Sequence, residues 1–110
     1  MLYVSARMTP SLPPGTRFIV PQTGTKKYTA VIPLPDGKRR RVGFGHRDYQ
    51  QYRDAVPRAL GGGQWSLADH LDSIRRADYR RRHGAQRCED GTPCVERLYS
   101  PAWFSYNFLW

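Results

Sequence analysis

The sequence predicts a small α+β domain with a β-hairpin, one long basic helix, an extended N-terminal arm and an aromatic C-terminal segment. An Asp-Gly turn lies between two runs of β-forming residues, and helix-capping residues precede an Arg-rich stretch. Six of the fourteen aromatic residues fall in the last twelve positions. Because 110 residues suffice for one domain, we expect an arm over residues 1–24 and a domain over 25–110.

The N-terminal arm is predicted from its prolines and glycines. They are Pro10, Pro13, Pro14, Gly15, Pro21 and Gly24. Proline removes a backbone donor and disfavours both helix and sheet, so we expect an extended and irregular segment. The apolar run Phe18-Ile19-Val20 is suited to pairing as an edge strand, and a partner surface would order it.

The β-hairpin is predicted over residues 26–45. A run of β-forming residues at 27–32 is followed by a Pro-Asp-Gly-Lys turn and by a return strand over 39–44. Glycine suits such a turn because it readily adopts a positive φ. Alternation along the return strand places Arg41 on the opposite face from Val42.

A first helix is predicted between residues 48 and 58. Tyr49, Tyr52 and Val56 recur at helical spacing, and Pro57 would end the helix. The glycine run that follows predicts a flexible connection.

The long basic helix is predicted over residues 67–83. Ser66 and Asp69 form a capping pattern at its start, and Gly84 suits a left-handed cap at its end. We expect this helix to pack on the hairpin through an apolar face formed by Leu67, Leu71, Ile74 and Ala77.

The C-terminal segment is dense in aromatic side chains. Strand-like alternation along it would place Phe104, Tyr106, Phe108 and Trp110 on one wholly aromatic face. Aromatic residues dominate both domain cores and interfaces, so the segment forms either the core or the anchors of a contact. Since a domain of this size has room for only part of it, we name as candidate partner contacts Phe18, Ile19, Trp103, Phe104, Tyr106, Phe108 and Trp110.

The charge of the chain points to an anionic partner or to arginine contacts with proteins. Eighteen Lys and Arg residues against nine acidic residues give a formal net charge of +9. The densest clusters are added to the candidate contacts: Arg39, Arg40, Arg41, Arg80, Arg81 and Arg82. These side chains either bind phosphates or form solvated faces and protein contacts, and no RNA-binding motif accompanies them.

No pattern in the sequence predicts catalysis, a cofactor or a metal. The nucleophile elbow, the P-loop and the zinc-protease motif are missing. Cys88 and Cys94 stand six positions apart, and with His83 they match zinc spacing poorly. We favour free thiols over a zinc site or a disulfide. No apolar run reaches the length of a membrane span, and the N-terminus lacks the pattern of a signal peptide.

Short motifs over residues 26–110 resemble those of one protein family. They are Lys27-Tyr28, Phe44-Gly45, Asp48-Tyr49, Tyr79 through Arg82-His83, Gly91, Ser100-Pro101 and Leu109-Trp110. In this order they are similar to a family of small proteins, formerly of unknown function, from nucleocytoplasmic large DNA viruses. The segment with Gly61-Gly62-Gly63 and Trp65 is longer here than in that family.

The resemblance implies a non-enzymatic virion component, a minor capsid (cement) protein of a large icosahedral DNA virus. Its implied partners are the major capsid protein and other minor capsid proteins. It would be made in the host cytoplasm and reside in the capsid, with an internal virion membrane nearby. The alternative is a basic nucleic-acid-binding protein packaged with the genome, whose contacts would be non-specific.

Overall fold

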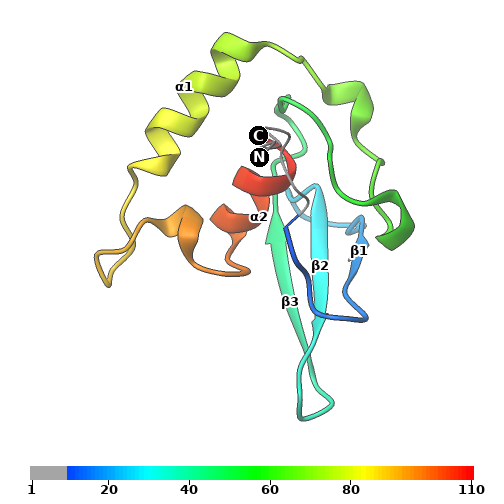
Figure 1. Ribbon diagram of the computed structural model, residues 1–110. Helices are drawn as coiled ribbons and strands as arrows, with labels where there is room; N and C mark the ends of the chain where they lie inside the picture. Colours follow the sequence, from blue (N-terminus) through cyan, green and yellow to red (C-terminus); the bar gives the residue numbers. More distant parts are fainter. Residues whose placement is uncertain (1–9) are drawn as a thin grey trace, which may run out of the picture.

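A three-stranded antiparallel sheet organises the structure, a computed structural model that describes residues 10–110 (Figure 1). Its strands lie in the order β1 (Arg17–Ile19), β2 (Tyr28–Pro33) and β3 (Arg39–Phe44). Together with two α-helices, this sheet confirms the predicted class of a small α+β domain. The part of the predicted arm before residue 10 lies outside the described residues.

The β2–β3 hairpin forms where it was predicted. Tyr28 pairs with Phe44 at its base, and Pro33 pairs with Arg39 next to the turn. The turn is closed by a 2.8 Å hydrogen bond from the Leu34 amide to the Lys38 carbonyl. Gly37 has a φ of 84° in this turn, a conformation that glycine adopts without a steric penalty.

Strand β1 adds the predicted edge strand to this hairpin. Phe18 pairs with Ala30, and its side chain is only 3% exposed. Residues 17–19 therefore belong to the sheet, although they fall within the predicted arm. A division of the chain at residue 25 stays a prediction.

The C-terminal segment is a helix, α2 (Pro101–Phe108), and the predicted alternation is wrong. Ser100 caps it by accepting a 3.1 Å hydrogen bond from the Trp103 amide, and Pro101 occupies the first helical position. Helical periodicity turns Trp103, Phe104 and Phe108 towards the core, where all three are buried.

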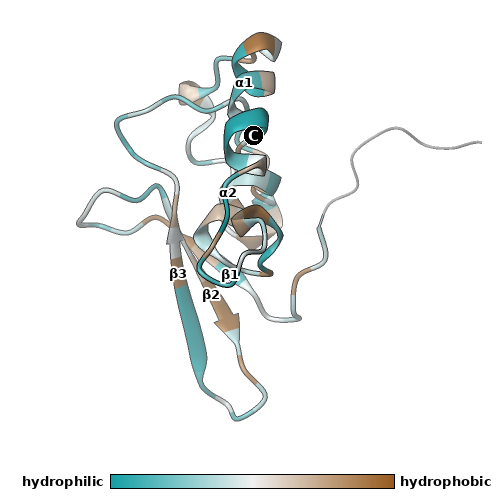
Figure 2. Ribbon diagram, turned by 90° about the vertical axis from the view of Figure 1, so that its left-hand side faces the viewer, coloured by the Kyte–Doolittle hydropathy of each residue, from teal (hydrophilic) through white to brown (hydrophobic). Residues whose placement is uncertain are grey.

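Helix α2 covers one face of the sheet, the place expected for the long basic helix (Figure 1). Phe104 stacks on Phe44 with ring centroids 5.0 Å apart, and Phe18 packs edge-on against Phe104 at 5.9 Å. Strand β2 consists mainly of hydrophobic residues, whereas the half of β3 next to the hairpin turn is hydrophilic (Figure 2). The core thus lies between the sheet and α2.

Helix α1 (Ser73–Gly84) is the predicted basic helix, but it begins later than expected. Its cap is Asp72, whose carboxylate accepts hydrogen bonds of 2.9 and 3.1 Å from two amides of the first turn. Leu71, with a φ of 56°, separates α1 from the short 3-10 helix η2 (Ser66–Ala68).

The predicted capping pair of Ser66 and Asp69 does not cap α1. The Asp69 carboxylate instead accepts a 2.6 Å hydrogen bond from the Gln51 side chain and a 2.7 Å bond from the Asp54 amide. At the other end, Gly84 is the last helical residue and the cap is Ala85 in a right-handed conformation. Both predicted caps are therefore wrong.

The predicted apolar face of α1 is exposed rather than packed on the hairpin. Leu67, Leu71 and Ile74 are 104%, 60% and 73% exposed, and α1 contains no buried residue. The helix packs on α2 and on the 3-10 helix η3 (Cys94–Glu96).

The helix predicted between residues 48 and 58 is absent, and the segment forms a loop. Its backbone amides bond to the end of α2: Arg53 donates to the Leu109 carbonyl at 3.1 Å and Ala55 to the Phe108 carbonyl at 2.8 Å. These long-range bonds replace the bonds that a helix would have made. One further 3-10 turn, η1 (Arg58–Leu60), follows.

Over residues 10–110, none of the helices has the length and apolar character needed to cross a membrane.

Candidate functional site

A cleft of about 760 Å³ separates α1 from the loop that follows β3. Helix α1 forms one wall, residues 44–51 with Lys26 form the other, and α2 with Trp110 forms the floor. Figure 1 shows α1 standing apart from this loop, with α2 between them. The cleft therefore lies where three segments distant in the sequence approach one another.

The lining of the cleft is predominantly positive. Its cations are Lys26, Lys27, Arg75 and Arg82. The one acidic side chain among the described lining residues is that of Asp78, which lies 2.9 Å from Arg81 in an ion pair. Arg75 crosses the cleft to donate a 2.9 Å hydrogen bond to the neutral amide of Gln50. An anion is thus favoured over a cation in this cleft.

Stacked rings fix α1 to the floor of the cleft. Tyr79 lies parallel to Trp110 with centroids 4.1 Å apart, and its ring contacts that of His83 at 4.1 Å with the planes tilted by 32°. Burial raises the pKa of Tyr79 to about 12, so the phenol is neutral at physiological pH. A main-chain oxygen of Trp110 accepts a 2.6 Å hydrogen bond from Arg76.

The buried Lys27 supports the loop that forms the opposite wall of the cleft. It is 1% exposed and donates hydrogen bonds to the Tyr49 carbonyl, at 2.6 Å, and to the side-chain oxygen of Gln51. Burial lowers the pKa of Lys27 to about 8, against the opposing effect of the charges on Asp54 and Asp69. These bonds hold the loop over residues 46–51 in place.

The segment that contains Gly61-Gly62-Gly63 and Trp65 is attached through Asp54. Its carboxylate accepts a 2.5 Å hydrogen bond from the Tyr28 hydroxyl and a 2.8 Å bond from the Trp65 amide. Burial, together with the bond to Asp54, raises the pKa of Tyr28. The Trp65 indole donates at 2.9 Å to the Lys27 carbonyl, so the segment packs beside β2.

The arginines of β3 lie on both faces of the sheet. Val42 faces the core, so Arg40 lies on that side and Arg41 on the opposite one, as predicted. Arg41 and Arg17 flank Val31 across the sheet, and Val31 is only 2% exposed between them. Arg39 shares the face of Arg41 next to the turn.

The arginines at the end of α1 point in different directions. Arg80 lies over the ring of Tyr106 at 4.0 Å, Arg81 pairs with Asp78, and Arg82 lines the cleft. The two predicted arginine clusters therefore do not form one continuous strip.

Most of the aromatic candidates for partner contacts are core residues. Phe18, Trp103, Phe104 and Phe108 are at most 8% exposed. Tyr106 and Trp110 are half-buried, and Ile19 is 38% exposed. In the folded chain, a partner reaches Ile19, Tyr106 and Trp110 rather than the other four.

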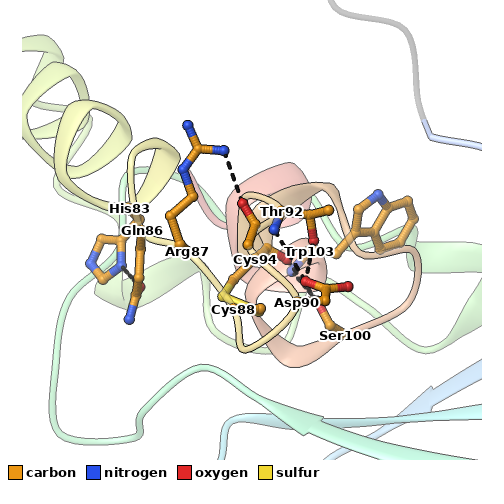
Figure 3. The surroundings of a disulfide bond; sticks show 10 residues. His83, Gln86, Arg87, Cys88, Asp90, Thr92, Cys94, Ser100 and Trp103 are labelled. Atoms are coloured by element: carbon orange, nitrogen blue, oxygen red, sulfur yellow. Dashed lines mark hydrogen bonds between the residues drawn. A yellow bond between two sulfur atoms is a disulfide. The ribbon is translucent and has the colours of Figure 1, made fainter.

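Cys88 and Cys94 form a disulfide, so the favoured interpretation of free thiols is wrong (Figure 3). Arg87 and Pro93 pair as an isolated antiparallel bridge, which brings the two cysteine Cα atoms to 5.1 Å. Asp90 orders the enclosed turn by accepting a 2.7 Å bond from the Thr92 hydroxyl, and this bond lowers the pKa of Asp90.

His83 lies away from the disulfide and contacts Tyr79 and Gln86. Within residues 10–110, no three His, Cys, Asp or Glu side chains are grouped so as to hold a metal ion.

The sequence motifs identify part of the cleft. Lys27, Gly45, Tyr49, Tyr79 and Trp110 all come from the short motifs that carry the family resemblance. Sequence reasoning missed Lys26, Arg75, Gln50 and Ser105, because no local pattern distinguishes them from solvated residues. Comparisons with family models, curated proteins and solved structures find no match to this chain.

Proposed function

We propose that this chain is a non-enzymatic structural protein of a large icosahedral DNA virus. It acts as a minor capsid (cement) protein that contacts major capsid capsomers and other minor capsid proteins. Its place is in the capsid of the virion, after synthesis in the host cytoplasm.

The observation that carries this proposal is the convergence of the family-like motifs on one cleft. The strand motif contributes Lys27, the turn motif Gly45, the helix motif Tyr79 and His83, and the C-terminal motif Trp110. Four unrelated short matches would have no reason to meet in space. Their meeting supports a resemblance that concerns one folded unit, and with it the role that the resemblance implies.

The surface chemistry suits contacts with neighbouring proteins. Within residues 10–110, Arg39 and Arg41 form no ion pair with an acidic side chain, whereas Arg81 pairs with Asp78. Exposed guanidinium groups such as those of Arg39 and Arg41 are therefore available to carboxylates on another chain. Arginine forms planar, bidentate contacts with carboxylates and is enriched at protein interfaces.

Stepwise dissociation of virions tests this proposal. Particles are opened gently, the genome is released with nuclease, and shell and genome fractions are probed for this chain. We expect it to remain with the major capsid protein, which serves as the shell marker. Release with the genome, together with a packaged DNA-binding protein used as marker, would favour the alternative role in nucleic-acid binding.

A further inference from the structure

We infer that the cleft between α1 and residues 44–51 is a docking site for an extended, acidic segment of a partner protein. The identity of that partner as a neighbouring shell protein rests on the proposed function. The preference of the cleft for an acidic segment follows from the residues that line it.

Charge is the first reason. Four cationic side chains, one of them the buried Lys27, and a single acidic side chain among the described residues line the cleft. The carboxylate, Asp78, is already paired with Arg81. Arg75 donates its side-chain hydrogen bond to the neutral amide of Gln50, so its charge is not cancelled by that contact. Carboxylates entering the cleft would gain charge-assisted hydrogen bonds from Arg75 and Arg82.

The placement of the cations is the second reason. Arg75 and Arg82 lie seven positions apart on α1, about two helical turns, and both line the cleft. Lys26 lies on the opposite wall. Donors on both sides of a groove suit an extended chain that carries several carboxylates. A volume of about 760 Å³ is within the usual range of ligand pockets.

The stacked rings favour a peptide over a single-stranded nucleic acid. Nucleic-acid single strands bind largely by stacking bases on aromatic side chains. Here the ring of Tyr79 is stacked on that of Trp110 and lies at a tilt of 32° to that of His83, and the ring of Trp110 also lies 5.2 Å from that of His70. Tyr79 and Trp110 therefore each cover one ring face of the other, whereas Arg82 and Lys26 remain available to carboxylates.

Fluorescence anisotropy with a labelled Glu-rich peptide and its Gln counterpart tests the inference on the full chain. We expect the Glu peptide to bind and the Gln peptide to bind at least about tenfold more weakly. The double variant Arg75→Gln/Arg82→Gln should weaken binding of the Glu peptide by about tenfold or more. The single variant Arg82→Gln leaves the Arg75–Gln50 bond intact and should show part of this loss.

The matched control is Arg17→Gln/Lys38→Gln, which removes two exposed charges from the sheet and its hairpin turn, outside the cleft. We expect it to change peptide affinity less than about twofold, with circular dichroism showing that each variant is folded. Equal losses in both double variants would overturn the inference in favour of non-specific attraction by net charge. Tighter binding of a single-stranded oligonucleotide, reduced by the same cleft variants, would assign the cleft to nucleic acid.

The two proposals fail separately. If the chain stays with the viral shell but the Glu peptide does not bind, the docking site is wrong and the capsid role stands. If the peptide binds in the cleft but the chain leaves with the genome, the capsid role is wrong and the acidic-peptide site stands.

Discussion

The ring of Tyr79 lies parallel to the indole of Trp110, with 4.1 Å between centroids and 5° between planes. This stack joins a helix that has no buried residue to the last residue of the chain. Arg76 adds a 2.6 Å hydrogen bond to a main-chain oxygen of Trp110. The position of one wall of the cleft therefore depends on the C-terminus.

Replacing Trp110 with Ala should loosen α1 without unfolding the sheet. The stack with Tyr79 is lost, at a cost of about 1–2 kcal/mol in the free energy of unfolding. Hydrogen–deuterium exchange should become faster in α1 and stay unchanged in β2. Trp110→Phe keeps a ring at this position and is the control. Unchanged exchange in α1 of Trp110→Ala would show that other contacts hold the helix.

Replacing Phe104 with Ala should destabilise the whole domain. Phe104 is 0% exposed and stacks on Phe44, so we expect a loss of about 3–5 kcal/mol in urea unfolding. The matched control is Leu67→Ala, because Leu67 is 104% exposed and should change stability by less than about 0.5 kcal/mol. A small effect at Phe104 would contradict its place in the core.

The free energy of unfolding should rise between pH 8 and pH 10. Lys27 has a pKa of about 8 in the folded chain against an ordinary 10.5. Between these values the unfolded chain binds more protons, so stability increases with pH, by at most about 1.4 kcal/mol per pH unit. Above about pH 10 the raised pKa values of Tyr28 and Tyr79 act in the opposite direction, since the unfolded tyrosines ionise first.

Chemical denaturation of Lys27→Met across this interval isolates the contribution of Lys27. This variant should lose the slope with pH, whatever its absolute stability. Lys38→Met, in the exposed turn, should keep the slope of the unmodified chain. A slope retained in Lys27→Met would assign the pH dependence to another group.

Replacing Asp72 with Ala should shorten α1, whereas replacing Ser66 with Ala should not. Asp72 accepts two amide hydrogen bonds of the first helical turn, and Ser66 lies in the separate helix η2. Exchange of the Ile74 and Arg75 amides should accelerate only in Asp72→Ala. Faster exchange in Ser66→Ala but not in Asp72→Ala would instead support the longer helix that the sequence predicts.

The hairpin and the edge strand were predictable because their determinants are local. The Pro-Asp-Gly-Lys turn and the β-forming runs beside it lie within about twenty residues, and β1 pairs with the nearest strand. The basic helix was predictable as an element but not in its limits. Only separate motifs of the cleft were predictable. No local sequence pattern shows that Arg75, Lys26 and Gln50 lie close together in the folded chain.

By itself, the sequence determined the α+β class, the hairpin and the excess of positive charge. Only the tertiary structure decided how the remaining segments use their polar groups. Asp69 bonds to Gln51 rather than capping a helix, and the amides of Arg53 and Ala55 bond to the end of α2. A buried polar group is stabilised by whichever partner the folded chain brings within reach, and that partner need not be near in sequence. For the same reason the aromatic C-terminus became a core helix, because Phe44 and Phe18 offered it a surface to cover.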